Sequence, residues 1–108
     1  MDDKLSEVIA EREFETYDRD GQLGHTILLR VSKPQIISEE NHKSWYCFYQ
    51  IIGIGDEEGY EGRGGDSMQA LMLSLRRAQA QLKFYAKHNH MKIKWFGQDD
   101  LDLPDSGY

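Results

Sequence analysis

The sequence has one cysteine, two prolines and no apolar run near the roughly twenty residues needed to span a bilayer. Its single thiol, Cys47, excludes an internal disulfide. The first residues have neither the basic flank nor the apolar centre of a signal peptide. We therefore expect a cytoplasmic protein with no membrane contact.

Positive charge is also scarce: there are 13 lysines and arginines against 19 aspartates and glutamates, and the net charge is −6 at pH 7. Nucleic-acid binding depends on clustered basic side chains that displace counterions from phosphates, so we expect no nucleic-acid partner. The acidic balance instead favours encounter with a basic protein through electrostatic steering. With 108 residues and 39% hydrophobic side chains, the chain is sufficient for one folded domain.

One long segment, Asp66 to Asn89, has helical periodicity. Asp66 is predicted to cap the start of this helix, with Gln69 at the capping-box position three residues later. Apolar residues recur at steps of three and four, so they are predicted to form one buried stripe: Met68, Leu71, Met72, Leu75, Ala78, Leu82, Tyr85 and Ala86.

The rest of the sequence alternates as β-strands do, at residues 8–17, 25–33, 44–54, 60–63 and 91–96. The most apolar segment, 44–54, is predicted to lie in the middle of the sheet, and residues 35–43 to form a polar connection. A row of glutamates on residues 8–17 suits an outer strand. The fold predicted is α+β, with an antiparallel four- or five-stranded sheet and one long helix packed on one face. Residues 1–96 are expected to form the domain, and residues 97–108 an acidic C-terminal tail.

A glycine-rich segment precedes the helix, and such segments can hold an anion against the helix N-terminus. It lacks the lysine and hydroxyl residue of a nucleotide-binding loop, and Asp66 would occupy the same N–H donors. The alternative function is therefore a small-ligand-binding or enzymatic domain that uses the Gly53–Gly65 loop and the helix N-terminus.

No other pattern indicates catalysis or metal binding. The spacing of the four histidines matches no zinc motif. Cys47 lies in an apolar strand, where a thiol is buried and inert. We expect no catalytic residue, no metal and no cofactor.

Three acidic groups, each near aromatic residues in the sequence, are the candidate partner-binding sites. Aromatic anchors inside charged rims are typical of protein interfaces, whereas an ordinary solvated surface is the alternative. The candidate residues are Glu11, Glu13, Glu15, Asp56, Glu57, Glu58, Trp95, Asp99, Asp100 and Asp102. Apolar residues on both faces of the 44–54 strand also leave a homodimer open.

Two motifs resemble those of a small bacterial family of domains of unknown function. They are W-x-C-x-Y-x-I (Trp45, Cys47, Tyr49, Ile51) and, after Gly53 and Gly55, G-x-D-x-x-Q-A-L (Gly64, Asp66, Gln69, Ala70, Leu71). Together with the opening I-A-E-R-E-F at Ile9 to Phe14, the resemblance covers residues 9 to 82 or so, and it implies no catalytic residues. In build and charge the chain is also similar to bacterial toxin-immunity proteins. The function expected is a non-enzymatic protein-binding module, such as an immunity protein that masks the active site of a basic toxin domain with an acidic surface.

Overall fold

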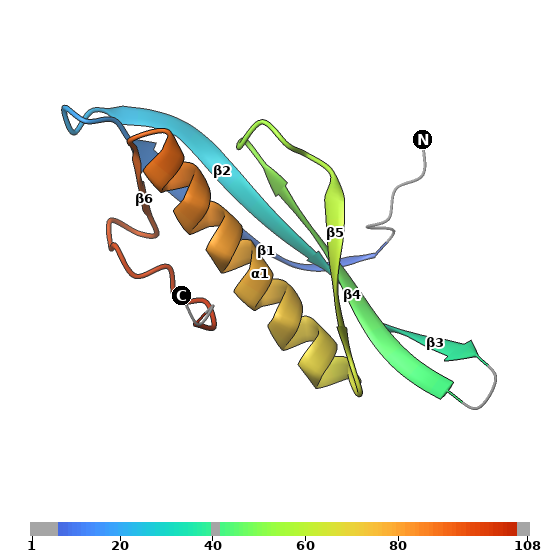
Figure 1. The fold of residues 1–108 in the computed structure, drawn as a ribbon. Coiled ribbons are helices and arrows are strands. Elements are labelled where there is room, and N and C mark those ends of the chain that lie inside the picture. The colour runs from blue at the N-terminus through green and yellow to red at the C-terminus, as the bar shows by residue number, and fades with distance from the viewer. Residues whose placement is uncertain (1–6, 40–41, 106–108) are drawn as a thin grey trace.

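The computed structural model describes residues 7–39 and 42–105. In these ranges the chain forms one open antiparallel sheet of six strands with a single long helix packed across one face (Figure 1). The predicted α+β fold is confirmed. The elements in chain order are β1 (Val8–Tyr17), β2 (Leu23–Ser32), β3 (Gln35–Glu39), β4 (His42–Ile52), β5 (Gly59–Gly64), α1 (Ser67–His88) and β6 (Lys92–Lys94).

Strand β4 is the centre of the sheet, as its apolar sequence predicts. One edge pairs with β2 at residues 49–52 and with β3 at residues 42–46, while the opposite edge pairs with β5 at residues 45–50. The prediction of a polar connection at residues 35–43 is wrong, because residues 35–39 form β3. Ile36 and Ile37 are β-branched residues that fit a strand, and Ile36 pairs with Trp45 of β4.

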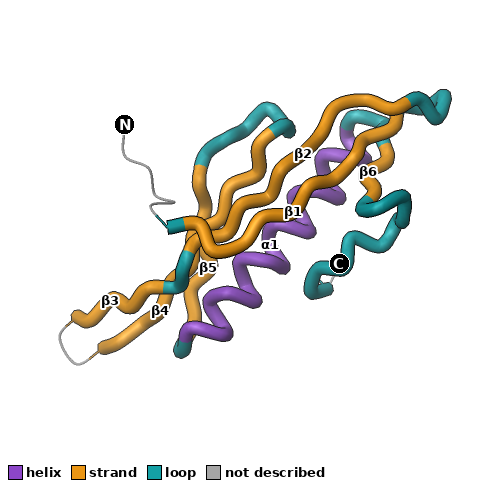
Figure 2. Tube along the Cα trace, turned by 180° about the vertical axis from the view of Figure 1, so that it is seen from behind, coloured by secondary structure: helices purple, strands orange, loops and turns teal. Residues whose placement is uncertain are grey.

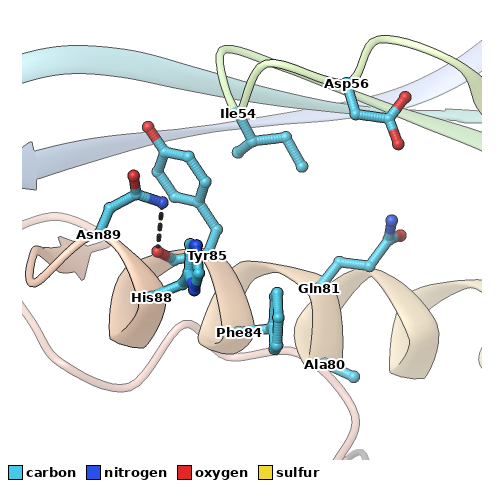
Figure 3. Close-up of a pocket in the computed structure, with 8 residues that line it drawn as sticks. All are labelled: Ile54, Asp56, Ala80, Gln81, Phe84, Tyr85, His88 and Asn89. Atoms are coloured by element: carbon cyan, nitrogen blue, oxygen red, sulfur yellow. Dashed lines mark hydrogen bonds between the residues drawn. The ribbon is translucent and has the colours of Figure 1, made fainter.

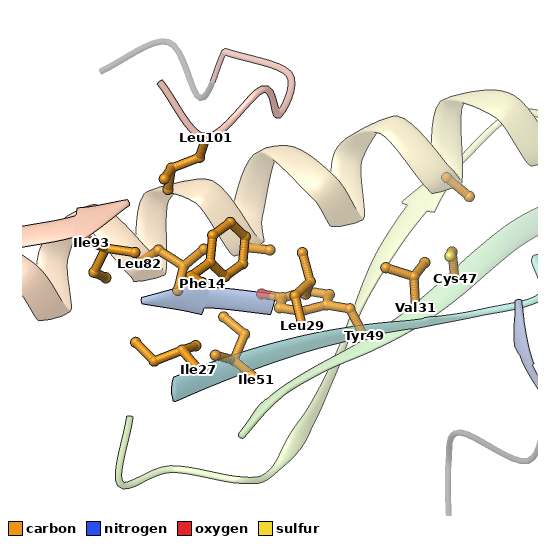
Figure 4. Packing of buried hydrophobic residues seen from close by; sticks show 12 residues of the cluster. Phe14, Ile27, Leu29, Val31, Cys47, Tyr49, Ile51, Leu82, Ile93 and Leu101 are labelled. Atoms are coloured by element: carbon orange, nitrogen blue, oxygen red, sulfur yellow. The ribbon is translucent and has the colours of Figure 1, made fainter. Parts of the chain in front are cut away.

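The hydrophobic core lies between α1 and the sheet (Figure 4). Ile27, Leu29 and Val31 of β2 face the helix, as their alternation predicts. The periodicity of β4 leaves its buried face undecided; Cys47, Tyr49 and Ile51 are the residues on it. The full set of buried hydrophobic residues is Phe14, Ile27, Leu29, Val31, Cys47, Tyr49, Ile51, Ala70, Ala78, Leu82, Ile93 and Leu101.

The buried face of α1 differs from the predicted stripe in its first half. Met68 and Met72 are 69% and 38% exposed, and Ala70 and Ser74 are buried in their place. The reason is a close approach of β5: a Cβ added to Gly62 would lie 2.6 Å from the backbone nitrogen of Ser74. Only small side chains fit such a contact, so the helix turns its methionines outward. The start of the helix is as predicted, because the Asp66 carboxylate accepts a 2.7 Å hydrogen bond from the Gln69 N–H.

The prediction that the first strand is an outer one is only partly right, since β1 pairs with β2 on one side and with β6 on the other. Because β6 has three residues, it reaches only Glu15, Thr16 and Tyr17 of β1. Within the described ranges no strand lies against Val8–Phe14 on that side.

Residues between 97 and 105 pack onto the domain. Leu101 is 7% exposed and belongs to the core, and Leu103 packs against it. The Arg12 guanidinium donates hydrogen bonds to the carbonyl oxygens of Leu101, at 2.9 Å, and Asp102, at 2.7 Å. In the described part of the chain, no helix has the length and hydrophobicity of a membrane-crossing segment.

Candidate functional site

A groove of about 510 Å³ runs beside β1, and we call it the edge groove. Side chains of a strand alternate between the two faces of a sheet, so a hollow on one face is lined by every second residue. Here five consecutive residues of β1 contribute, so the groove reaches the edge of the strand, and Thr26 of β2, which pairs with Glu15, shows that it also extends over the sheet face that carries the glutamates. Figure 2 shows β6 beside β1 at this end of the sheet. Its lining residues are Glu11, Arg12, Glu13, Phe14, Glu15, Thr26, Trp95 and Phe96.

Two of the three glutamates in the edge groove are available to a partner. Glu11 forms an ion pair with Arg30, with 3.1 Å between Oε2 and Nε. Among residues 7–39 and 42–105, Glu13 and Glu15 have no ion pair. Lys94 stands opposite Glu15 in the β1–β6 register, but its Nζ lies 3.7 Å from a carboxylate oxygen of Asp99. The groove therefore presents net negative charge.

The aromatic side of the edge groove is a tight turn. Trp95 and Gln98 exchange two backbone hydrogen bonds of 2.9 Å, which leaves Phe96 and Gly97 as a two-residue loop. Both have positive φ, 50° and 76°, as a type I′ turn requires. The φ of Phe96 is costly for a residue with a large side chain, and the residue is 78% exposed. The turn thus holds an aromatic ring in solvent at the mouth of an acidic groove.

Arg12 connects this turn to β1. Its guanidinium lies 4.3 Å from the centre of the Trp95 ring, a cation–π contact, and also binds the carbonyls of Leu101 and Asp102. Arg12 and Phe96 are not among the predicted partner-binding residues. Gly97, a turn residue directly after a short strand, is the signal that could have placed Phe96 in a turn. The role of Arg12 depends on residues about 90 positions away, which no local pattern contains.

The structure brings together Glu11, Glu13, Glu15 and Trp95 of the predicted partner-binding residues. It separates the others. Asp102 lines a neighbouring cavity of about 180 Å³ that shares Glu11 and Arg12 with the groove. Asp99 and Asp100 line a cavity of about 200 Å³ against α1. Glu57 and Glu58 are exposed in the β4–β5 loop, and Asp56 of that loop lines a fourth cavity.

That fourth cavity, the helix cavity, has a volume of about 450 Å³ and lies between the β4–β5 loop and the C-terminal half of α1 (Figure 3). It is lined by Ile54, Asp56, Ala80, Gln81, Phe84, Tyr85, His88 and Asn89. Hydrogen bonds from the Tyr60 hydroxyl, at 2.5 Å, and the Glu58 N–H, at 3.1 Å, lower the pKa of the Asp56 carboxyl. A charged carboxylate therefore stands beside an apolar wall.

At the helix N-terminus, which the alternative function invokes, the cap residue takes up N–H donors of the first turn. Asp66 accepts from the Gln69 N–H, and the Gln69 side-chain oxygen accepts from the Gly65 N–H at 2.6 Å. The cavity that the Gly53–Gly65 loop does line is at the other end of α1.

Cys47 is a structural thiol. It is fully buried, its Sγ donates to the Ser32 carbonyl oxygen at 3.3 Å, and burial raises the pKa of the thiol. A thiol with a raised pKa is a poor nucleophile. Within the described ranges, no three histidine, cysteine or acidic side chains lie close enough together to hold a metal ion.

Of three comparisons with known proteins, one found a match. No curated protein and no solved structure matches the chain. A family model described as "Domain of unknown function (DUF6968)" matches residues 10–105, a range that includes every residue lining the edge groove. The chain therefore belongs to the DUF6968 family of domains of unknown function.

Proposed function

We propose that the chain is a non-enzymatic protein-binding module whose edge groove receives a basic partner. One observation carries the proposal: Glu13, Glu15 and the exposed Phe96 line the same groove. Among the described residues, neither glutamate has an ion pair. Carboxylates around an aromatic anchor complement a partner rich in lysine and arginine. The position of Trp95 under the Arg12 guanidinium makes one wall of the groove rigid, which limits the entropy lost on binding.

The specific role within this proposal is that of a bacterial immunity protein in the cytosol. Such a protein neutralises a toxin by occluding its active site, and clefts that bind nucleic acid are basic. An acidic groove of this size matches one strand or loop of a toxin domain rather than its whole surface. The remaining acidic residues, including Glu57 and Glu58, would then steer the encounter through their long-range field.

The experiment is binding to the protein encoded by the neighbouring gene, measured by calorimetry at two salt concentrations. The double variant Glu13→Lys/Glu15→Lys should weaken binding at least tenfold, and salt should weaken binding of the unaltered protein. Glu57→Lys/Glu58→Lys changes the net charge equally in a loop outside the groove, so it serves as the matched control. Equal losses in the two double variants would reject the groove as the contact, and absence of binding would reject the immunity role.

The helix cavity supports the second candidate, a small-ligand-binding domain. Its apolar wall of Ile54, Phe84 and Tyr85 beside the Asp56 carboxylate suits a small molecule with an aromatic ring and an amine. Titration with phenethylamine, followed by NMR, tests it. Shifts confined to the cavity and lost in Asp56→Asn, but retained in Glu57→Gln, would favour this candidate over the first.

A further inference from the structure

We propose that the edge groove binds an extended basic segment of the partner as an additional strand beside β1, in line with β6. This inference rests on the proposed function and specifies its binding mode. In strand addition, backbone hydrogen bonds supply affinity and side chains at alternate positions supply specificity.

The first support is the incomplete cover of β1. This strand has ten residues, and β6 pairs with Glu15, Thr16 and Tyr17. Among residues 7–39 and 42–105, no strand occupies the same side of Val8–Phe14. Edge strands present a row of N–H and C=O groups that can hydrogen-bond to an added chain.

The second support is the shape of the space beside that edge. The edge groove is lined by residues 11–15 without a gap, but Phe14 is fully buried, so its open wall is formed by Glu11, Arg12, Glu13 and Glu15. The C-terminal segment lies outside it: no residue after Phe96 lines the groove among those that the structure describes, and Leu101 and Asp102 accept hydrogen bonds from the Arg12 side chain. At about 3.3 Å per residue, five strand residues span roughly 16 Å, which is the length of a short peptide segment. Such a segment would lie on the same side of β1 as β6 and would end where β6 begins to pair with β1.

The third support is the charge pattern, which also selects the occupant. Glu11, Glu13 and Glu15 alternate with Arg12 and Phe14, so the three carboxylates project from one face of the sheet. An added strand directs every second side chain to that face, and opposite charges on neighbouring strands attract. The segment should therefore carry lysine or arginine at alternate positions. A second copy of this chain, paired β1 to β1, would bring like charges together, and this disfavours a homodimer through the same edge.

The experiment uses the full chain and a defined probe, the blocked peptide Lys-Thr-Lys-Thr-Lys-Thr-Lys. Amide hydrogen exchange of the protein is measured by NMR with and without the peptide. Strand addition predicts slower exchange at every second amide between Ile9 and Phe14. Two methylated peptides should be compared, one with methyl groups on the odd-numbered backbone nitrogens and one with them on the even-numbered nitrogens. One set should weaken binding about tenfold and the other little, because only alternate N–H groups of a strand point to β1.

A charge exchange provides the matched control. The variant Glu13→Lys/Glu15→Lys should lose the lysine peptide and bind Glu-Thr-Glu-Thr-Glu-Thr-Glu, with the same amides protected. Rescue of this kind separates strand addition from misfolding of the variant, because an unfolded chain would bind neither peptide in this pattern.

Three outcomes would overturn the inference. Peptide binding without alternate amide protection would reject strand addition while leaving a basic partner in the groove. Absence of peptide binding at millimolar concentration would reject the edge as a receptor for extended basic segments, even if the neighbouring-gene protein binds. The same amides protected without peptide, together with a dimeric mass in ultracentrifugation, would assign the edge to a second copy.

Discussion

The N–H of Gly62 donates a 3.0 Å hydrogen bond to the hydroxyl of Ser74, which itself donates to the carbonyl oxygen of Cys47 at 2.5 Å. One buried hydroxyl thus connects α1 to both β5 and β4. Because Gly62 has no side chain, the helix backbone can approach β5 closely enough for this contact. The position of α1 on the sheet depends on this pair.

Replacement of Gly62 by alanine should therefore destabilise the domain. The new Cβ would lie 2.6 Å from the Ser74 nitrogen and 2.9 Å from the Ala70 carbonyl oxygen, so the helix must move. We expect the free energy of unfolding in urea to fall by about 1–3 kcal/mol. Gly65→Ala is the control, because its Cβ would meet only the Gln69 side chain at 3.5 Å. Equal losses in the two variants would show that the close approach of α1 to Gly62 is not responsible.

Phe96→Asn should separate stability from binding. Asparagine adopts positive φ more readily than phenylalanine and favours the first position of a type I′ turn, so unfolding free energy should rise by about 1 kcal/mol. Loss of the exposed ring should weaken partner binding about tenfold. Urea unfolding and calorimetry measure the two effects. If stability rises and affinity is unchanged, Phe96 is not an anchor.

Stability should decrease at high pH in a manner that depends on Tyr49. Burial raises the pKa of its hydroxyl to about 12. An exposed tyrosine in the unfolded chain loses its proton near pH 10, whereas the folded chain still holds it, so ionisation favours unfolding between pH 10 and 12. This group should lower the unfolding free energy by up to about 1.4 kcal/mol per pH unit in that window. Tyr49→Phe should remove this part of the decrease in urea unfolding measured at pH 9, 10 and 11. An unchanged slope would contradict the assignment.

Leu101→Ala tests whether residues 97–105 belong to the folded domain. Leu101 is 7% exposed, and truncation of a buried leucine costs about 2–5 kcal/mol. Leu23→Ala, at a leucine that is 68% exposed, should have little effect in the same urea experiment. A loss below about 0.5 kcal/mol at Leu101, within the range of ordinary surface substitutions, would indicate that the segment detaches without consequence.

Local sequence patterns predict much of this fold. The bounds of β1 follow from alternation at Val8–Tyr17, and the start of α1 follows from the Asp66 cap. Periodicity fails where a distant segment decides the environment. Met68 and Met72 fit an apolar stripe, but Gly62 of β5 admits only small residues at that contact.

The candidate site was predictable only in part for the same reason. Alternation places Glu11, Glu13 and Glu15 on one face, and the sequence neighbours of Trp95 suggest an aromatic surface. That these two regions border one groove depends on the pairing of β6 with β1, between segments nearly eighty positions apart. The open part of the edge depends in turn on the three-residue length of β6, where alternation predicts six.

The position of β4 has a consequence for how the sheet can fail. Hydrogen-bonded ladders run along both of its edges, to three partners. A slip of one residue would turn Cys47, Tyr49 and Ile51 toward water and mismatch all three ladders together. The register of β4 therefore fixes the register of its three neighbours. Loss of that register should appear as one cooperative unfolding transition rather than as separate dissociation of single strands.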